Sequence, residues 1–284
     1  MRSYVIYTSI NTANLSKSLS NIEHWKEYPE VECVKLIQNN REYQQISGYI
    51  RGIKDITVVN TGEDGEGSGS SDNPKELPSL KELLEYMRRE SLEDNDPRDH
   101  MYLNADIIIR NRAFFQDLGS VSGYIALLHR RDVSISKNGI EEKGVYIHGI
   151  DGFCVSSLML ESIQYGCSDM FYLGLPGWDQ YLPLLCWLNG WQQRFIASKS
   201  AIHKIHNTSN PGRYSYFACR LISLYIFEYY LKTRSRYIRR IVNLTSWMGR
   251  IDWVTSIGHK LVVFPALWSL GWKIQRKAHR SSSK

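Results

Sequence analysis

The sequence predicts an α/β protein with a mixed, mainly parallel central sheet flanked by helices, followed by a C-terminal helical extension. Through the first half of the chain, short apolar runs typical of strands alternate with runs whose apolar residues recur at helical spacing. Strands separated by helices favour a parallel sheet with right-handed crossovers. The 284 residues, 43% hydrophobic and 23% charged, are ample for a full core and ordinary for a folded chain.

The first elements are expected to follow one another as strands and helices up to residue 90. The strands are expected at 3–9, 32–38 and 55–60, and the helices at 14–25 and 79–90. Asn14 is a plausible N-cap for the first helix, and Pro78 leads into the second. The glycine-rich stretch 61–74 is expected to be a loop.

The run "YLNADIII" at 102–109 reads as a buried strand that carries Asn104 and Asp106 near its end. In sheets of this class, ligands collect beyond the carboxyl ends of the strands. We therefore expect Asp106 to face a ligand. The alternative is that Asp106 only closes a turn.

The middle of the chain is expected to be mixed. Strands are expected at 123–133 and 145–156 around an "SKNG" turn, helices at 157–165 and 179–190, a strand at 194–206 and a long aromatic helix at 214–233.

Four polar features follow one another in these elements. They are Asn104 with Asp106, Asp151 between Gly149 and Gly152 in "GIDG", Asp179 at a helix start in "LPGWDQYLP", and the pair His203 and His206 in "HKIH".

This order resembles the GT-A fold of glycosyltransferases over residues 3–210, so the expected domains are a GT-A-like catalytic domain at 1–212 and an extension at 213–284. "YLNADIII" takes the place of the acidic DxD motif, with Asn104 in place of the first acid. Trp178 stands where the family usually has a glutamate before Asp179. The glycine-containing loop at 61–74 lacks the arginine often found there.

The resemblance implies a nucleotide-sugar donor and a bound Mn²⁺ or Mg²⁺, which would neutralise the departing diphosphate. Asp106 and a late histidine, His203 or His206, would be the protein ligands. Two histidines three positions apart on a strand point to opposite faces, so at most one is expected to ligate, and His203 is preferred. Asn104 is expected to hydrogen-bond the donor ribose or the backbone rather than the metal.

Asp179 is the expected catalytic base of an inverting reaction, and Asp151 is the second candidate. Asp151 and Gly152 are otherwise expected to contact donor or acceptor, and the ring of Trp178 to pack on a sugar. The competing interpretations are that Asp179 is only an N-cap and that Asp151 only supports a bulge.

Two further polar pairs are open to both a binding and a structural interpretation. Ser9 and Asn11, after the first strand, either hold the nucleotide base or form an ordinary turn. His129 and Arg130 either meet phosphate or lie at a solvated strand end.

The tail is strongly basic and rich in tryptophan. Residues 231–284 hold 12 Lys/Arg against one acid, Asp252, a net charge of +11, while the whole chain carries +6 and residues 1–230 therefore about −5. Half of the eight tryptophans lie in this segment: Trp247, Trp253, Trp268 and Trp272. This favours an anionic membrane surface over nucleic acid, with helices packed on the catalytic body as the alternative.

The remaining composition favours a reducing compartment. The five cysteines are scattered without CxxC spacing, and the sequence carries neither a secretory signal nor a spanning segment. We expect a cytoplasmic enzyme that is peripheral on the inner face of the membrane.

The predicted function is metal-dependent sugar transfer to a saccharide or lipid-linked acceptor in cell-surface polysaccharide or lipopolysaccharide synthesis. One alternative is a sugar nucleotidyltransferase, although "SINTANLSKS" lacks the early glycine-rich signature with Arg and Lys usual in such enzymes. The other is a non-catalytic sugar- or lipid-binding scaffold of the same fold.

Overall fold

A computed structural model of the chain describes most residues up to 204. The described ranges are 2–10, 15–38, 40–51, 53–60, 78–93, 98–119, 121, 123–136, 139–145, 150–167, 171–173 and 178–204. The predicted extension at 213–284, its membrane surface and its long helix therefore lie outside the described residues, as do His206, Asn11 and Asn14.

Nine elements lie in the described residues up to 118. They are β1 (Tyr4–Thr8), α1 (Leu15–Trp25), β2 (Val31–Gln38), α2 (Asn40–Ile50), β3 (Ile56–Asn60), α3 (Leu80–Glu93), β4 (Asp99–Leu103), β5 (Ile107–Ile109) and α4 (Ala113–Leu118), with β6 (Ile125–Leu128) next.

The rest of the described chain is mixed. Its elements are β7 (Arg131–Ser136), β8 (Gly139–Val145), β9 (Gly152–Ser156), α5 (Ser157–Gly166), α6 (Trp178–Leu188), β10 (Gln193–Ile196) and β11 (Ala201–Lys204).

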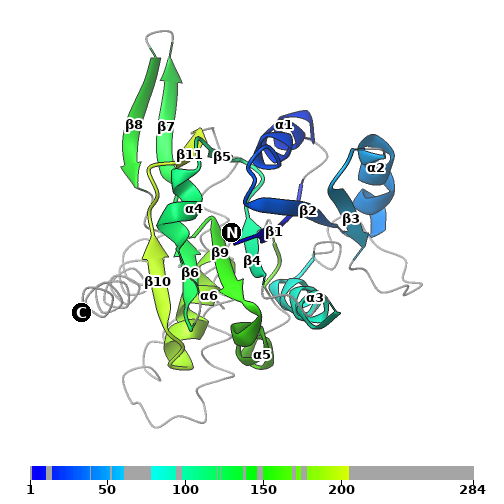
Figure 1. Ribbon diagram of the computed structural model, residues 1–284, viewed down its shortest axis with the longest axis vertical. Coiled ribbons are helices and arrows are strands. Elements are labelled where there is room, and N and C mark those ends of the chain that lie inside the picture. The colour runs from blue at the N-terminus through cyan, green and yellow to red at the C-terminus, as the bar shows by residue number, and fades with distance from the viewer. Residues whose placement is uncertain are drawn as a thin grey trace, which may run out of the picture.

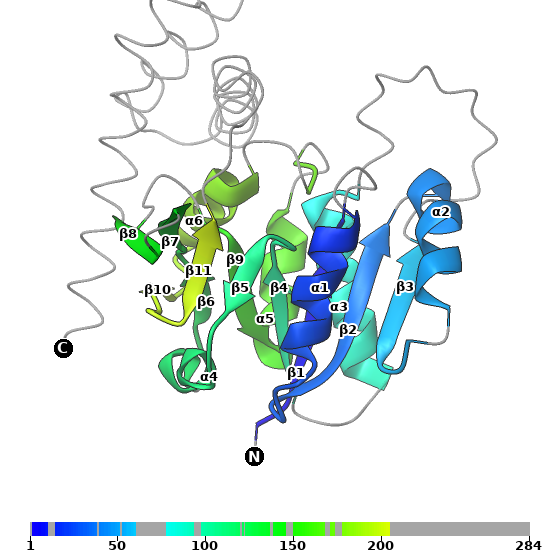
Figure 2. The ribbon, with the colours of Figure 1, turned by 90° about the horizontal axis from the view of Figure 1, so that it is seen from above.

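Seven strands form the central sheet in the order β10-β6-β9-β4-β1-β2-β3. All neighbouring pairs are parallel except those made by β9, which runs antiparallel to both β4 and β6. Figures 1 and 2 show this sheet with helices on both of its faces. The expected mixed, mainly parallel sheet flanked by helices is confirmed.

The helices divide between the two faces of this sheet. On one face, α3, α5 and α6 pack on alternate strand residues such as Val5 and Tyr7 of β1. On the other face, α1, α2 and α4 pack on the intervening residues, such as Tyr4 and Ile6. Because every residue of β1 is buried, the strand reads as a continuous apolar run, as expected for a strand covered on both sides.

Helix α3 begins at a capping box. Ser79 Oγ accepts a hydrogen bond from the backbone N–H of Glu82 (3.1 Å), and the Glu82 carboxylate accepts one from the backbone N–H of Ser79 (2.6 Å). This pairing, with Pro78 before it, explains why the helix starts here, as the sequence predicts for 79–90.

A second sheet of four strands was not predicted. It has the order β5-β11-β7-β8, with β11 parallel to β7 and antiparallel to β5. Figure 1 shows the β7–β8 hairpin extending away from the body of the molecule.

The second sheet arises where predicted single strands are divided. The 102–109 run breaks at Asn104–Asp106 into β4 and β5, 123–133 divides into β6 and β7, and 194–206 gives β10 and β11. The strand predicted at 145–156 is wrong in its middle, because Asp151 lies in a bend before β9. Helix α2 was not predicted. Among the described residues, no helix combines the length and apolar character needed to cross a membrane.

Candidate metal and substrate site

The carboxyl ends of β4 and β6 lie on either side of the amino end of β9, and polar residues gather there. After β4 the chain turns at Asn104–Asp106, and the N–H of Ile107 bonds to the carbonyl of Asn104 (3.1 Å). Asp151 lies between the two strand ends: its N–H donates to Leu128 O and its carbonyl accepts from Asn104 N, both at 2.9 Å. The antiparallel direction of β9 thus delivers Asp151 to the same edge as the turn.

The second sheet brings two more side chains, those of His203 and Asp132, to this edge. In its register His203 of β11 lies opposite Ile107 of β5 on one side and Asp132 of β7 on the other. Asp106 directly precedes Ile107, so Asp106, His203 and Asp132 become neighbours although they come from three separate parts of the sequence.

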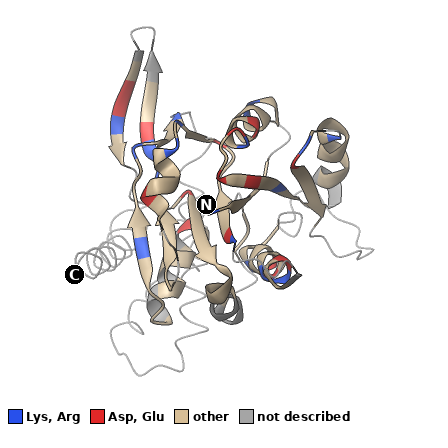
Figure 3. Ribbon diagram, in the orientation of Figure 1, with Lys and Arg blue, Asp and Glu red and all other residues tan. Residues whose placement is uncertain are grey.

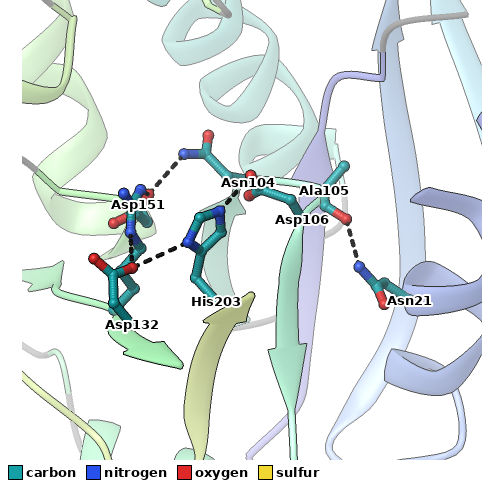
Figure 4. Close-up of polar contacts among 8 residues, drawn as sticks. Asn21, Asn104, Ala105, Asp106, Asp132, Asp151 and His203 are labelled. Atoms are coloured by element: carbon teal, nitrogen blue, oxygen red, sulfur yellow. Dashed lines mark hydrogen bonds and ion pairs between the residues drawn. The ribbon is translucent and has the colours of Figure 1, made fainter. Parts of the chain in front are cut away.

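Asp106 and His203, the residues that the sequence singles out as metal ligands, lie in direct contact. Asp106 Oδ2 is 3.1 Å from His203 Nε2 (Figure 4). The imidazole is buried, with 6% of its side chain exposed, whereas Asp106 keeps 35%. The pair therefore sits at the boundary between core and solvent, where a small ligand can reach it.

A chain of contacts continues from His203 to Asp151. Asp132 Oδ1 is 3.0 Å from His203 Nδ1 and 2.8 Å from Arg130 Nε. Arg130 Nη1 donates to Asp151 Oδ1 at 2.6 Å. The contacts begin at Asp106 and end at Asn104, on the same turn. We therefore use the name polar ring for the six residues Asn104, Asp106, Arg130, Asp132, Asp151 and His203.

The polar ring closes through Asn104. Its Nδ2 donates to Asp151 Oδ1 at 3.2 Å. An aspartate at position 104 would place a second carboxylate beside Asp151 in a buried setting, which is unfavourable. This contact gives a physical reason for the asparagine in place of the first acid of a DxD motif.

The polar ring is acidic. Three carboxylates, Asp106, Asp132 and Asp151, face one guanidinium, which leaves two negative charges in excess when the imidazole is neutral. Burial, opposed by Arg130, raises the pKa of the Asp151 carboxyl. Burial lowers the pKa of Arg130, but the two carboxylates beside it outweigh this and raise its pKa overall, so the guanidinium stays charged. The excess matches the charge of one divalent cation.

The donor atoms of Asp106 and His203 fit such a cation. Ligands of an octahedral Mg²⁺ lie about 2.0–2.1 Å from the ion, so adjacent ligand atoms are about 3 Å apart. The observed separation is 3.1 Å. Among the described residues no group of three or more His, Cys, Asp or Glu side chains could hold a metal ion. The described part of the chain thus offers Asp106 and His203 as two ligands, and substrate and water oxygens would complete the shell.

Asp151 supplies a second sign of a missing binding partner. Its residue is 3% exposed, and its Oδ2 has no hydrogen-bond partner among the described residues. A buried carboxylate oxygen without a partner is costly, so its presence beside the Asp106–His203 pair favours a ligand there.

Two predicted substrate contacts are corrected by the structure. Trp178 is 4% exposed and packs edge-on against Tyr102, with ring centroids 5.1 Å apart, so its face is not available to a sugar. Gly152 is also buried, and a Cβ there would lie 2.4 Å from the carbonyl oxygen of Tyr102. Glycine is needed because β9 approaches β4 closely.

For Ser9, Asp179 and His129 the structure gives a position and surroundings but no role in binding or catalysis. Burial raises the pKa of the Tyr102 hydroxyl, and a side-chain hydrogen bond with Ser9 opposes this rise. Asp179 lies in the first turn of α6 and is half-buried. His129 is not at a solvated strand end: it is buried and stacks on Phe195, with centroids 5.0 Å apart.

Asp132 is the residue that sequence reasoning missed, whereas Arg130 was considered for phosphate contact or a solvated strand end. The available signal was the polar group "HRRD" after an apolar run, which marks the passage from one sheet to the next. Because 123–133 was interpreted as one strand, this passage between the sheets was not predicted.

Comparison with known proteins gives only distant likenesses. No protein-family model matches the chain, and no curated protein matches it. Solved structures that resemble it include the inositol-1-phosphate CTP transferase of T. maritima, with a TM-score of 0.44 and 12% identity over 76% of this chain and 95% of that one.

Two others are similar at the same level. A Bacillus anthracis protein described as a glucose-1-phosphate thymidylyltransferase has a TM-score of 0.43 and 8% identity over 70% of this chain and 87% of its own. The 4-diphosphocytidyl-2C-methyl-D-erythritol synthase of Anaerococcus prevotii has a TM-score of 0.39 and 10% identity over 71% of this chain and 92% of its own. Likenesses this distant carry no argument about which reaction the chain performs.

Proposed function

We propose that the chain is a metal-dependent transferase that takes a sugar from a nucleotide-diphosphate donor, that is, a glycosyltransferase. The observation that carries the proposal is the contact between Asp106 and His203 at the carboxyl end of β4. Ligand sites of open α/β sheets lie at this edge. The GT-A resemblance of the sequence assigns metal binding to the same two residues.

Asp106 and His203 would hold Mn²⁺ or Mg²⁺, and the imidazole favours Mn²⁺. When bound, the cation neutralises the charge that develops on a departing diphosphate. The polar ring itself requires this, because its excess of carboxylates would repel a diphosphate brought in without a cation. Nucleotide binding should therefore depend on the metal.

Asp179 is the proposed base for the acceptor hydroxyl, in an inverting reaction. Its neighbour Trp178 packs on Tyr102, and Tyr102 lies two residues before Asn104, so the first turn of α6 lies near the end of β4. Asp151 is the weaker candidate, since its Oδ1 already accepts from Arg130 and Asn104.

Changing Asp179 to Asn tests this assignment. The amide keeps the size of the side chain but does not take up the proton, so transfer should fall by at least about a hundredfold. Donor binding, followed by calorimetry with Mn²⁺, should stay within a factor of about two. Full activity of Asp179→Asn would show that the base is another residue.

Sugar nucleotidyl transfer is the second candidate, and the two reactions differ in their products. A glycosyltransferase given Mn²⁺ and a nucleotide-sugar releases a nucleoside diphosphate. A nucleotidyltransferase given a nucleoside triphosphate and a sugar phosphate releases pyrophosphate. Assaying both products over a panel of donors decides between them, and a scaffold would release neither. The absence of metal-dependent nucleotide binding in calorimetry would reject both enzymatic proposals.

The extension at 213–284 is proposed to bind an anionic membrane surface, on the strength of its charge and its tryptophans. This would make the chain peripheral on the cytoplasmic face and give it a lipid-linked acceptor. Flotation with anionic vesicles should recover the whole chain, whereas a chain ending at residue 233 should stay behind. Equal recovery of both would reject the membrane proposal.

A further inference from the structure

We infer that Asp132 is a positioning residue that orients His203 for metal binding and that Arg130 links this orientation to Asp151. This inference rests on the proposed function, because it concerns how the chain prepares its two metal ligands. Asp132 has no role in the sequence-based assignment of the site.

The contact between Asp132 and His203 fixes which ring nitrogen carries a proton. Asp132 Oδ1 lies 3.0 Å from Nδ1. An ionised carboxylate can only accept, so the imidazole donates from Nδ1. Nε2 faces the Asp106 carboxylate at 3.1 Å and would exchange its proton for a cation, after which the neutral ring keeps its one proton on Nδ1. Asp132 thus selects the tautomer that a cation shared with Asp106 needs.

Asp132 is itself held in place by Arg130. Its Oδ1 also accepts from Arg130 Nε at 2.8 Å. Asp132 and Arg130 are each only about 20% exposed in their side chains. Asp132 is the register partner of His203 in the second sheet, and Arg130 immediately precedes β7. A carboxylate fixed by a guanidinium and by its own strand can hold the ring in one orientation, as partners of metal-bound histidines do.

Arg130 also connects Asp132 to Asp151. Arg130 Nη1 donates to Asp151 Oδ1 at 2.6 Å, so one guanidinium joins the carboxylate that orients the metal ligand to the buried carboxylate beside Asn104. Asp151 is the ring's candidate for contact with substrate. A displacement of the Asp132 or Asp151 carboxylate should therefore displace the other, because both are bonded to the rigid guanidinium of Arg130.

The decisive experiment measures Mn²⁺ binding to the full-length protein by electron paramagnetic resonance, with the metal alone as the probe. Asp132→Ala should weaken Mn²⁺ binding about 10- to 100-fold, the usual loss for such partners. The matched control is Glu142→Ala, which removes the same charge from the same hairpin. Glu142 is half-exposed and meets only Arg131 and Arg110 at 3.8 and 4.0 Å among its described ion pairs. It should leave binding unchanged.

The melting temperature without metal separates positioning from general damage. If Asp132→Ala loses affinity while melting within a degree or two of Glu142→Ala, Asp132 acts on the metal ligand. If it binds Mn²⁺ as tightly as the unmodified protein, the inference is overturned and the proposed function stands. If the unmodified protein binds neither Mn²⁺ nor Mg²⁺, both are overturned.

A measurement on the unmodified protein keeps the test independent of any variant's folding. With Mg²⁺ bound, nitrogen chemical shifts of His203 should identify Nδ1 as protonated and Nε2 as not. Protonation at Nε2 instead would overturn the inference.

Discussion

The turn at Asn104–Asp106 and the strand β5 that follows are held on two sides by contacts of different kinds. On one side, residues of α1 and the segment after it donate to successive outward carbonyls. Asn21 Nδ2 bonds to Ala105 O (2.9 Å), Trp25 Nε1 to Ile107 O (3.1 Å) and Tyr28 Oη to Ile109 O (2.9 Å). On the other side lies the polar ring, in which charged side chains contact one another.

The difference separates fixing the backbone from preparing the chemistry. The α1 side uses neutral donors on backbone acceptors, an arrangement that is complete as it stands. The polar ring has an excess of negative charge and a buried carboxylate oxygen on Asp151 without a hydrogen-bond partner among the described residues. Substitutions on the α1 side should therefore change stability, and substitutions in the ring should change ligand binding.

The largest effect is expected at Asp106. Asp106→Asn removes the charged ligand, so Mn²⁺ affinity should fall by more than about a hundredfold, since loss of a ligand's partner alone costs about 10- to 100-fold. The metal-free protein should melt at the same or a higher temperature, because one of three neighbouring carboxylates is gone. A Mn²⁺ titration followed by electron paramagnetic resonance measures the affinity, and a thermal scan without metal measures the melting temperature. A clear fall in the metal-free melting temperature would mean that the ring is a structural device like the α1 side.

A smaller effect, on stability, is expected at Gly152. A Cβ would lie 2.4 Å from the backbone oxygen of Tyr102, so Gly152→Ala must push β9 away from β4, at about 1–3 kcal/mol. The control is Gly48→Ala in α2, where a Cβ meets nothing within 4 Å and alanine should stabilise the helix by about 0.5–1 kcal/mol. Urea unfolding measures both. Changes of the same sign would contradict the packing described here.

The smallest effect is expected at Asn21, on the α1 side. Asn21→Ala removes one hydrogen bond to the turn and should cost about 1 kcal/mol in the free energy of unfolding. Mn²⁺ affinity should stay within about threefold, because β5 is still held through Trp25 and Tyr28. Denaturant unfolding and the resonance titration report the two quantities. A loss of Mn²⁺ affinity as large as that of Asp106→Asn would erase the distinction between the two sides.

How far the sequence predicts the fold depends on whether an element is periodic by itself. Strands β1 and β2 and helices α1 and α3 each carry a local apolar pattern, and α3 also carries a capping box, so they were predicted within a few residues. Helix α2 has a largely polar sequence with Gly48 inside and gave no clear signal.

The second sheet could not be predicted, because apolar runs such as 102–109 look continuous across the point where the chain passes from one sheet to the other. Local patterns do not reveal which sheet a strand joins, since pairing depends on residues far away in the sequence. The same limit applies to the site. Asp106 and His203 were singled out by their order along the chain, whereas Asp132 becomes their neighbour only through the register of β11 with β7.

The hydrogen bonds from α1 have a consequence for association with other chains. Strand β5 lies at one edge of the second sheet, and exposed edge carbonyls invite another strand to pair. Because side chains of Asn21, Trp25 and Tyr28 already occupy those carbonyls, this edge is closed to strand addition. Among the described strands of this sheet, β8 forms the opposite edge, and its charged run Glu141–Lys143 discourages pairing there (Figure 3).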